Sequence, residues 1–146
     1  MAVESVELLL VEDNEDDIVL IQEAFAESKL ANVTNVVRDG QEALAYLRRE
    51  GKYKDARRPA LILLDINIPK KNGFEVLQEV KADPALRPIP VVMMTASDRE
   101  EDVVKSYSEG ACSYVRKPVD FDRLREVTRH FELYWTMVSR IPARMS

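Results

Sequence analysis

The sequence predicts one doubly wound α/β domain, in which a five-stranded parallel sheet carries helices on both faces. Short apolar runs recur along the chain, segments with helical spacing separate them, and glycine or proline lies in most of the gaps. The runs are aliphatic on both faces, which is typical of strands buried on two sides in a parallel sheet. The expected strands are 6–11, 33–37, 60–64, 91–94 and 113–115.

Each segment that follows a run has one apolar stripe, as expected of a helix that packs against a sheet. In chain order the stripes are Ile18, Ile21, Phe25 and Ser28; Ala43, Leu44 and Leu47; Phe74, Leu77 and Val80; Val103, Val104 and Tyr107; and Leu124, Thr128, Phe131 and Tyr134 or Trp135. Strand and helix alternate five times. In such a fold the functional crevice lies at the carboxyl ends of the strands.

Composition narrows the possible classes of protein. The 146 residues are 46% hydrophobic and 32% charged, which is ordinary for a globular domain. The net charge of −5 argues against nucleic acid as a partner. No run is long enough to span a membrane and no targeting segment is evident, so a cytoplasmic protein is expected. The single cysteine, Cys112, excludes an internal disulfide and is expected to be a small buried residue.

Polar side chains follow four of the expected strands at the point where each strand ends. They are Glu12 and Asp13 after the first, Asp65 after the third, Thr95 after the fourth and Lys117 after the fifth. Each has an ordinary explanation when taken alone, as a helix cap or a solvated charge. Because the carboxyl ends of parallel strands share one edge of the sheet, their convergence predicts a functional site there.

The chemistry expected of this site centres on Asp65. It follows four consecutive aliphatic residues, so the sheet should hold its carboxylate rigidly beside Glu12 and Asp13. A few hard oxygen ligands suit Mg²⁺ better than Zn²⁺, and an aspartate can accept a phosphoryl group covalently. The Thr95 hydroxyl and the Lys117 ammonium would then contact the phosphoryl oxygens.

Four motifs resemble the receiver domain of two-component response regulators, which has the CheY-like, flavodoxin-like (βα)5 fold. They are "VEDN", "LLDINIPKKNG", "MTA" and "GACSYVRKPVD", and they occur in the family's order and spacing. The resemblance implies that Asp65 is the phosphoacceptor. It also implies that a Mg²⁺ ion, with Mn²⁺ as an alternative, is held by Glu12, Asp13, Asp65 and the backbone carbonyl of Asn67.

The same resemblance assigns the other site residues. It implies that Thr95 and Tyr114 form a switch pair, that Lys117 contacts the phosphoryl group, and that Pro118 follows a cis peptide bond. The implied protein is a phosphoacceptor signalling domain rather than an enzyme, although it assists its own phosphorylation and dephosphorylation. Its partner would be a sensor histidine kinase, which donates the phosphoryl group.

A narrower resemblance is to stand-alone regulators paired with bacterial phytochrome kinases. It rests on "VEDNEDD", "REGKYKDARRP" and "ELYWTMVSRIP". Such regulators lack an output domain and often form homodimers. We therefore expect a receiver domain over 1–129, a C-terminal helical extension and tail over 130–146 that is too short for an output domain, and a phytochrome kinase as partner.

The C-terminal region by itself also predicts a homodimer. Its helical pattern runs from Asp120 to about Ser139, longer than one small domain can cover. Large side chains recur on several faces of this helix, and exposed apolar surface of that extent usually marks an interaction site. They are Phe131, Leu133, Tyr134, Trp135, Met137, Val138 and Ile141. The alternative is that the segment folds back and covers its own domain.

Other functions fit the sequence less well. The alternative is a Mg²⁺-dependent aspartyl-phosphate hydrolase of the haloacid-dehalogenase type, but it would use a second aspartate where this chain has Asn67. A flavodoxin-like cofactor binder would need a phosphate-binding loop after the first strand, where this chain places acids. A degenerate receiver would have lost the acceptor or the lysine, and both Asp65 and Lys117 are present.

Overall fold

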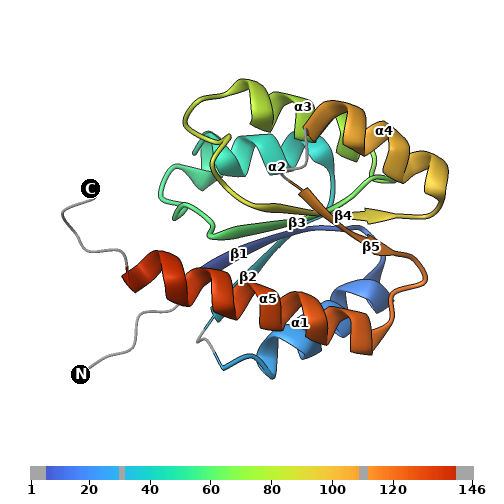
Figure 1. Ribbon diagram of the computed structural model, residues 1–146. Coiled ribbons are helices and arrows are strands. Elements are labelled where there is room, and N and C mark those ends of the chain that lie inside the picture. Colours follow the sequence, from blue (N-terminus) through green and yellow to red (C-terminus); the bar gives the residue numbers. More distant parts are fainter. Residues whose placement is uncertain (1–5, 30–31, 109–111, 141–146) are drawn as a thin grey trace.

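The chain forms a parallel sheet between two layers of helices (Figure 1). The computed structural model describes residues 6–29, 32–108 and 112–140, and for 104–108, 112 and 136–140 it describes the backbone alone. The strands are β1 (Val6–Val11), β2 (Asn32–Val37), β3 (Leu61–Asp65), β4 (Val91–Thr95) and β5 (Cys112–Arg116). The helices are α1 (Glu15–Ala26), α2 (Gly40–Leu47), α3 (Gly73–Ala82), α4 (Asp98–Ser108) and α5 (Phe121–Arg140), with a 3-10 turn over Gly51–Tyr53.

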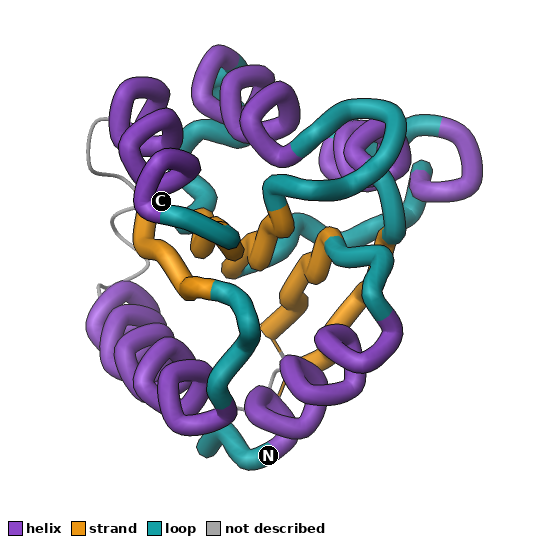
Figure 2. The backbone as a smooth tube through the Cα atoms, turned by 90° about the vertical axis from the view of Figure 1, so that its right-hand side faces the viewer, coloured by secondary structure: helices purple, strands orange, loops and turns teal. Residues whose placement is uncertain are grey.

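The strands lie in the order β2-β1-β3-β4-β5, and every neighbouring pair is parallel. β1 is therefore flanked by β2 on one side and by β3 on the other, and the chain reverses its direction of winding there. Open α/β sheets bind ligands beside such a reversal, at the carboxyl ends of the strands. The predicted doubly wound fold is confirmed, and Figure 2 shows the strands between the two layers of helices.

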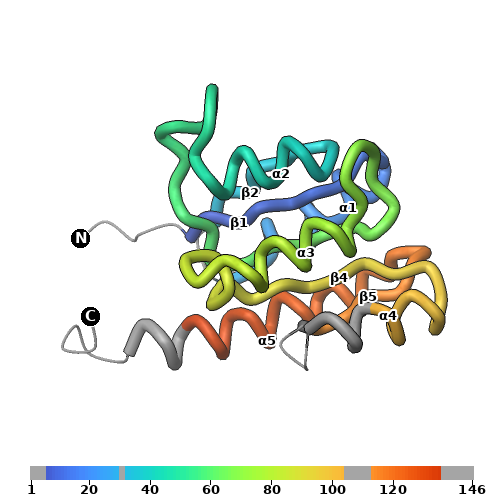
Figure 3. The backbone as a smooth tube through the Cα atoms, turned by 90° about the horizontal axis from the view of Figure 1, so that it is seen from above, coloured from blue at the N-terminus to red at the C-terminus, as the bar shows by residue number. Residues whose placement is uncertain are grey.

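The sheet divides the hydrophobic core in two. Helices α2, α3 and α4 cover one face, and α1 and α5 cover the other (Figures 1 and 3). Because successive strand residues point to opposite faces, each aliphatic run supplies both cores. The first core includes Leu9, Val11, Leu44, Ile62, Leu64, Leu77 and Met93, and the second includes Leu8, Leu10, Phe25, Leu63, Met94, Leu124 and Phe131.

Most of the predicted helical stripes are buried, with two differences at helix ends. Ser28 was expected on the first stripe, but α1 ends at Ala26, so this prediction is wrong. At the end of the last stripe Trp135 packs against the second core, whereas Tyr134 is exposed. The side chains of Val104, Tyr107, Cys112, Met137 and Val138, and the whole of Ile141, lie outside the described parts of the chain.

Helix α3 begins very close to the end of β3. A capping box formed by Asn72 and Glu75 fixes its first turn. Gly73 donates its N–H to the carbonyl of Ile66 at 2.8 Å. A Cβ atom at Gly73 would lie 2.6 Å from the carbonyl oxygen of Asp65, so only glycine lets the helix approach the strand end this closely.

Within the described residues, none of the helices combines the length and the apolar character needed to cross a membrane. The longest is α5, with 20 residues, and charged side chains recur along it. It begins and ends where the sequence pattern predicts. Helix α5 lies beside α1, on the face of the sheet that these two helices cover (Figure 1).

Candidate functional site

Three carboxylates from two adjacent strand ends form an acidic cluster at the carboxyl edge of the sheet. One oxygen atom from each of Glu12, Asp13 and Asp65 lies within 4.8 Å of the other two. Glu12 and Asp65 are buried, whereas Asp13 is exposed. The cluster is therefore anchored on one side and open to solvent on the other. Clustered carboxylate oxygens with room for water fit a hard divalent cation.

Lys117 supplies the positive charge that faces this cluster. Its Nζ lies 2.7 Å from Glu12 Oε1, 2.9 Å from Asp65 Oδ2 and 3.0 Å from Asp17 Oδ2. Its backbone N–H donates to the carbonyl of Thr95 at 2.7 Å, which ties the end of β5 to the end of β4. The peptide bond between Lys117 and Pro118 is cis. One ammonium thus offsets the repulsion among carboxylates from three elements.

The charges of the site are strongly interdependent. Burial raises the pKa of the Glu12 carboxyl to about 7, the neighbouring Asp65 adds to this shift, and Lys117 opposes it. Burial acts to lower the pKa of the Lys117 ammonium, but hydrogen bonds to Glu12, Asp65 and Asp17 outweigh it, so this pKa is raised. Lys117 therefore stays charged, while Glu12 tends to hold a proton. A divalent cation would compete with that proton.

Asp65 is fixed at both of its carboxylate oxygens. Oδ1 accepts the backbone N–H of Asn67 at 3.1 Å, and Oδ2 accepts from Lys117. The residue ends β3, in which all five residues are buried. The carboxylate therefore has one defined orientation, as a nucleophile or a metal ligand at this position requires.

The loop after β1 folds around the Glu12 side chain. Its Oε2 accepts the backbone N–H groups of Asp13 and Asn14 at 3.1 and 3.2 Å. Asn14 in turn caps α1, because its Oδ1 accepts the backbone N–H of Asp17 at 3.0 Å. The first turn of α1 is thus held against the site, and this brings Asp17 within reach of Lys117.

Thr95 and Tyr114 lie on the neighbouring strands β4 and β5. Thr95 is fully buried, and its Oγ1 has no hydrogen-bond partner within the described residues. An unpaired buried hydroxyl costs about 1–3 kcal/mol, so an anionic oxygen beside it would be stabilised. Tyr114 lies opposite Met93, two residues before Thr95 on β4, and packs half-buried against the first core. The structure therefore brings the two residues to one region of the sheet.

Two site residues were not predicted. Asp17 lies in the first turn of α1, where a carboxylate favours the positive N-terminal end of the helix, and it also pairs with Lys117. Glu100 accepts the backbone N–H of Ala96 at 2.6 Å and a side-chain N–H of Asn67 at 3.4 Å, and so links the loops after β3 and β4. Ser97 followed three residues later by Glu100 is a capping pattern that would have located it.

A parallel five-stranded sheet with this acidic cluster, a strand-end aspartate and a facing lysine is the arrangement expected of a receiver type of signalling domain. The chain belongs to the response regulator receiver domain family, whose model matches residues 8–129. This match favours the receiver interpretation over the haloacid-dehalogenase-type hydrolase.

Several relatives resemble most of the chain. Response regulator Rcp1 of Synechocystis sp. is 40% identical over 136 residues, which cover 93% of this chain and 92% of Rcp1. The solved structure of the phosphorylated cyanobacterial phytochrome response regulator RcpA has a TM-score of 0.77 at 44% identity, covering 96% of this chain and 100% of that one. The structure of the bacteriophytochrome response regulator RtBRR has a TM-score of 0.77 at 48% identity, and the match covers 88% of this chain and 78% of that one. The protein is thus a response regulator homologous to phytochrome response regulators.

Proposed function

We propose that this response regulator accepts a phosphoryl group on Asp65 from a sensor histidine kinase, in a Mg²⁺-dependent step. The observation that carries the proposal is the buried Asp65 carboxylate, anchored by the Asn67 N–H and facing the Lys117 ammonium. The homology of this chain to RcpA, whose solved structure is of a phosphorylated form, supports the same assignment. The kinase we propose is of the bacterial phytochrome class, because RcpA and RtBRR are phytochrome response regulators.

The acidic cluster fits the ion that such a step requires. We propose that Asp13 and Asp65 bind Mg²⁺ directly, Glu12 mainly through water, and Asn67 through its backbone carbonyl, with Mn²⁺ as an alternative. The donors are hard oxygens that lie close together, as this ion prefers. A Mn²⁺-bound form of Rcp1 has been solved; it is 39% identical to this chain with a TM-score of 0.75, and the match covers 94% of this chain and 99% of that one. Bound here, the ion would supply positive charge to the transferred group.

The protein's own residues would perform the transfer and read its result. A carboxylate oxygen of Asp65 forms the new P–O bond as the P–N bond of the donor phosphohistidine breaks. Lys117 binds one phosphoryl oxygen, and the unpaired Thr95 hydroxyl donates to another. Tyr114 then moves toward the space that Thr95 leaves, which changes the surface of α4, β5 and α5.

The receiver domain would span 1–129, with 130–146 as its extension.

The proposal is tested by the mass of the intact protein after incubation with acetyl phosphate, with and without Mg²⁺. One added phosphoryl group, formed only with the metal, is the expected result. Asp13→Asn should weaken both Mg²⁺ binding, measured by titration calorimetry, and phosphorylation by about tenfold or more, equal to ~1.4 kcal/mol. Asp16→Asn is the matched control, because Asp16 is an exposed carboxylate on the same segment. A loss in the control but not in Asp13→Asn would refute the metal assignment.

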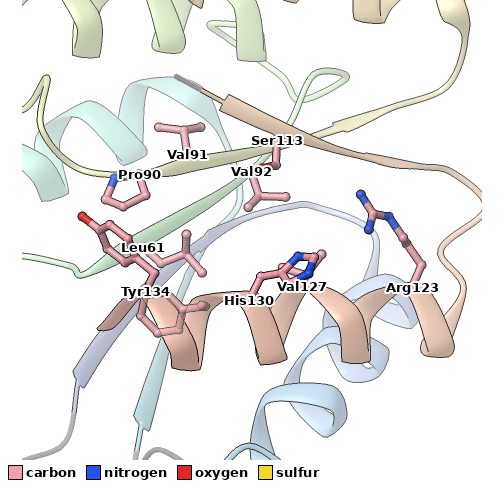
Figure 4. Close-up of a pocket in the computed structure, with 10 residues that line it drawn as sticks. Leu61, Pro90, Val91, Val92, Ser113, Arg123, Val127, His130 and Tyr134 are labelled. Carbon is pink, nitrogen blue, oxygen red and sulfur yellow. The ribbon is translucent and has the colours of Figure 1, made fainter. Parts of the chain in front are cut away.

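We also propose that the regulator forms a homodimer through α5. Leu133 and Tyr134 on this helix are 61% and 43% exposed. Tyr134 lines an open apolar cavity of about 290 Å³ between α5 and the sheet, together with Val92 and Val127 (Figure 4). β5 is an edge strand of that sheet. Exposed apolar groups beside an edge strand favour association with a second copy.

Part of α5 packs against its own domain. Phe131 is buried in the second core, and Trp135 packs against it. The predicted interface therefore narrows, among side chains the structure describes, to the face that carries Leu133 and Tyr134. Truncation after His130 would remove Phe131 and damage the core, so a point variant is the better test.

Leu133→Glu is expected to convert the dimer to a monomer, because it places a charge in an apolar contact between copies. Sedimentation velocity at high micromolar concentration measures the change. Val33→Glu is the matched control, since Val33 is 44% exposed on β2 at the other edge of the sheet. A full chain that is monomeric whether phosphorylated or not would contradict the dimer.

A further inference from the structure

A basic segment lies between α2 and β3, and nothing proposed so far uses it. Residues 48–58 include six basic and two acidic side chains, in a chain whose net charge is −5. Four of the basic residues line a cavity of about 650 Å³ that also includes the first residues of β1 and the aromatic ring of Trp135 on α5. They are Arg49, Lys54, Arg57 and Arg58. The cavity adjoins the amino end of β1, whereas Asp65 is at the opposite edge of the sheet.

Few negative charges lie close to the cations that line this cavity. The other two basic residues of the segment are paired outside it, Arg48 with Glu79 and Lys52 with Glu42. In the parts of the chain that the structure describes, none of the four lining cations forms a salt bridge.

Two acids also line the cavity and leave an excess of positive charge. Glu7 already accepts a hydrogen bond from Asn35 at 3.0 Å, and Asp55 is exposed. Arg58 donates to the carbonyl of Ala85 at 2.5 Å, which fixes one guanidinium in position without neutralising it. Four cations against two acids make this cavity electropositive in an acidic protein.

Arg49 is held in a backbone conformation that arginine rarely adopts. Helix α2 ends in a Schellman motif, in which the N–H of Glu50 donates to Ala45 at 2.9 Å and the N–H of Arg49 donates to Tyr46 at 3.2 Å. The φ angle of Arg49 is +57°, and glycine is the usual residue at this position. A side chain here costs about 1–2 kcal/mol. The chain thus places a guanidinium at the cavity where glycine would fold more easily.

We propose that this cavity binds a small polyphosphate anion of the nucleoside polyphosphate class. Guanidinium groups bind phosphate oxygens through paired N–H donors, and three arginines line the cavity. Its volume is within the range of small-molecule sites. The half-buried indole of Trp135 offers a surface on which a base can stack. A concave cavity with an aromatic residue in its lining suits a compact ligand better than an extended acidic segment of a protein.

Trp135 makes the proposal directly testable, because it is the only tryptophan of the chain and its fluorescence reports on the cavity. The full chain carrying Asp65→Asn, in metal-free buffer, is titrated with inorganic tripolyphosphate, with ATP and with a hexaglutamate peptide. Both phosphate ligands should give a saturable change that weakens as salt increases. Tighter binding of ATP than of tripolyphosphate would show that the base contributes to affinity. A response to hexaglutamate alone, or to none of the three, would overturn the proposal.

Variants separate the cavity from general surface charge. Arg57→Ser should weaken binding about tenfold or more, because it removes a donor of paired hydrogen bonds. Arg49→Gly removes a cation, and glycine suits the positive φ at this position. The variant should therefore melt at the same or a higher temperature than the parent and still bind the phosphate ligands more weakly. Arg129→Ser is the matched control, as an exposed arginine of α5 that does not line the cavity. An equal loss in the control would refute a specific site.

Discussion

Asp65→Asn is expected to abolish the gain of a phosphoryl group from acetyl phosphate while the fold is retained. The amide is not a nucleophile, but it occupies the same volume, and its oxygen can still accept the backbone N–H of Asn67. The mass of the intact protein measures the loss. Because the change removes one charge from a cluster of carboxylates, the metal-free variant should unfold at the same temperature as the parent or higher.

A matched variant makes this result specific to Asp65. Asp102 is an exposed aspartate on α4, and Asp102→Asn should leave phosphorylation unchanged. If Asp65→Asn were phosphorylated as well as the parent, Asp65 would not be the acceptor. If neither the parent nor the variants gained mass with Mg²⁺ present, phosphoryl transfer itself would be refuted.

Lys117→Ala is expected to have the largest effect on the stability of the metal-free protein. Lys117 faces two buried carboxylates, and its removal leaves them without a cation. Removing one partner of a buried ion pair costs about 3–5 kcal/mol. Urea denaturation without metal should show this loss, and Mg²⁺ should restore much of it, because the ion replaces the missing positive charge.

The same variant distinguishes the roles of the cations. Lys117→Ala should bind Mg²⁺ as tightly as the parent or more tightly, since a competing cation is gone, yet accept the phosphoryl group poorly. Lys70→Ala is the control, because Lys70 is exposed and its Nζ lies 3.6 Å from Asp39 Oδ2. This substitution should lower the free energy of unfolding by less than about 1 kcal/mol. A Lys117→Ala variant that lost the metal, beside an Asp13→Asn variant that kept it, would reverse the proposed roles.

The features predicted from sequence are those that local pattern determines. The aliphatic run before Asp65 is long enough to specify a strand buried on both faces, and β3 is buried throughout. A residue directly after such a strand must lie at the carboxyl edge, so the positions of Glu12, Asp65 and Lys117 followed from the alternation of strands and helices. The acidic cluster was predictable for the same reason.

The features that the sequence did not reveal depend on packing between distant segments. Asp17 reaches Lys117 only because α1 and the end of β5 meet in the fold, 100 residues apart in the chain. On α5, hydrophobic residues recur on several faces, so periodicity alone could not decide between Trp135, which packs against the core, and exposed Tyr134. No local pattern places Trp135 beside the arginines of residues 48–58, because only the fold brings α5 to this segment.

The buried position of Glu12 makes metal binding an acid–base event. Its raised pKa means that, near neutral pH, part of the protein population carries a proton on this carboxyl. That proton opposes the charge of the ion, so affinity for the metal should rise as pH increases toward about 7 and level off above it. A proton on Glu12 and a magnesium ion in the acidic cluster thus oppose each other, because both bring positive charge to the same site. On the proposed mechanism, the readiness of the regulator to receive its signal depends on the pH around it.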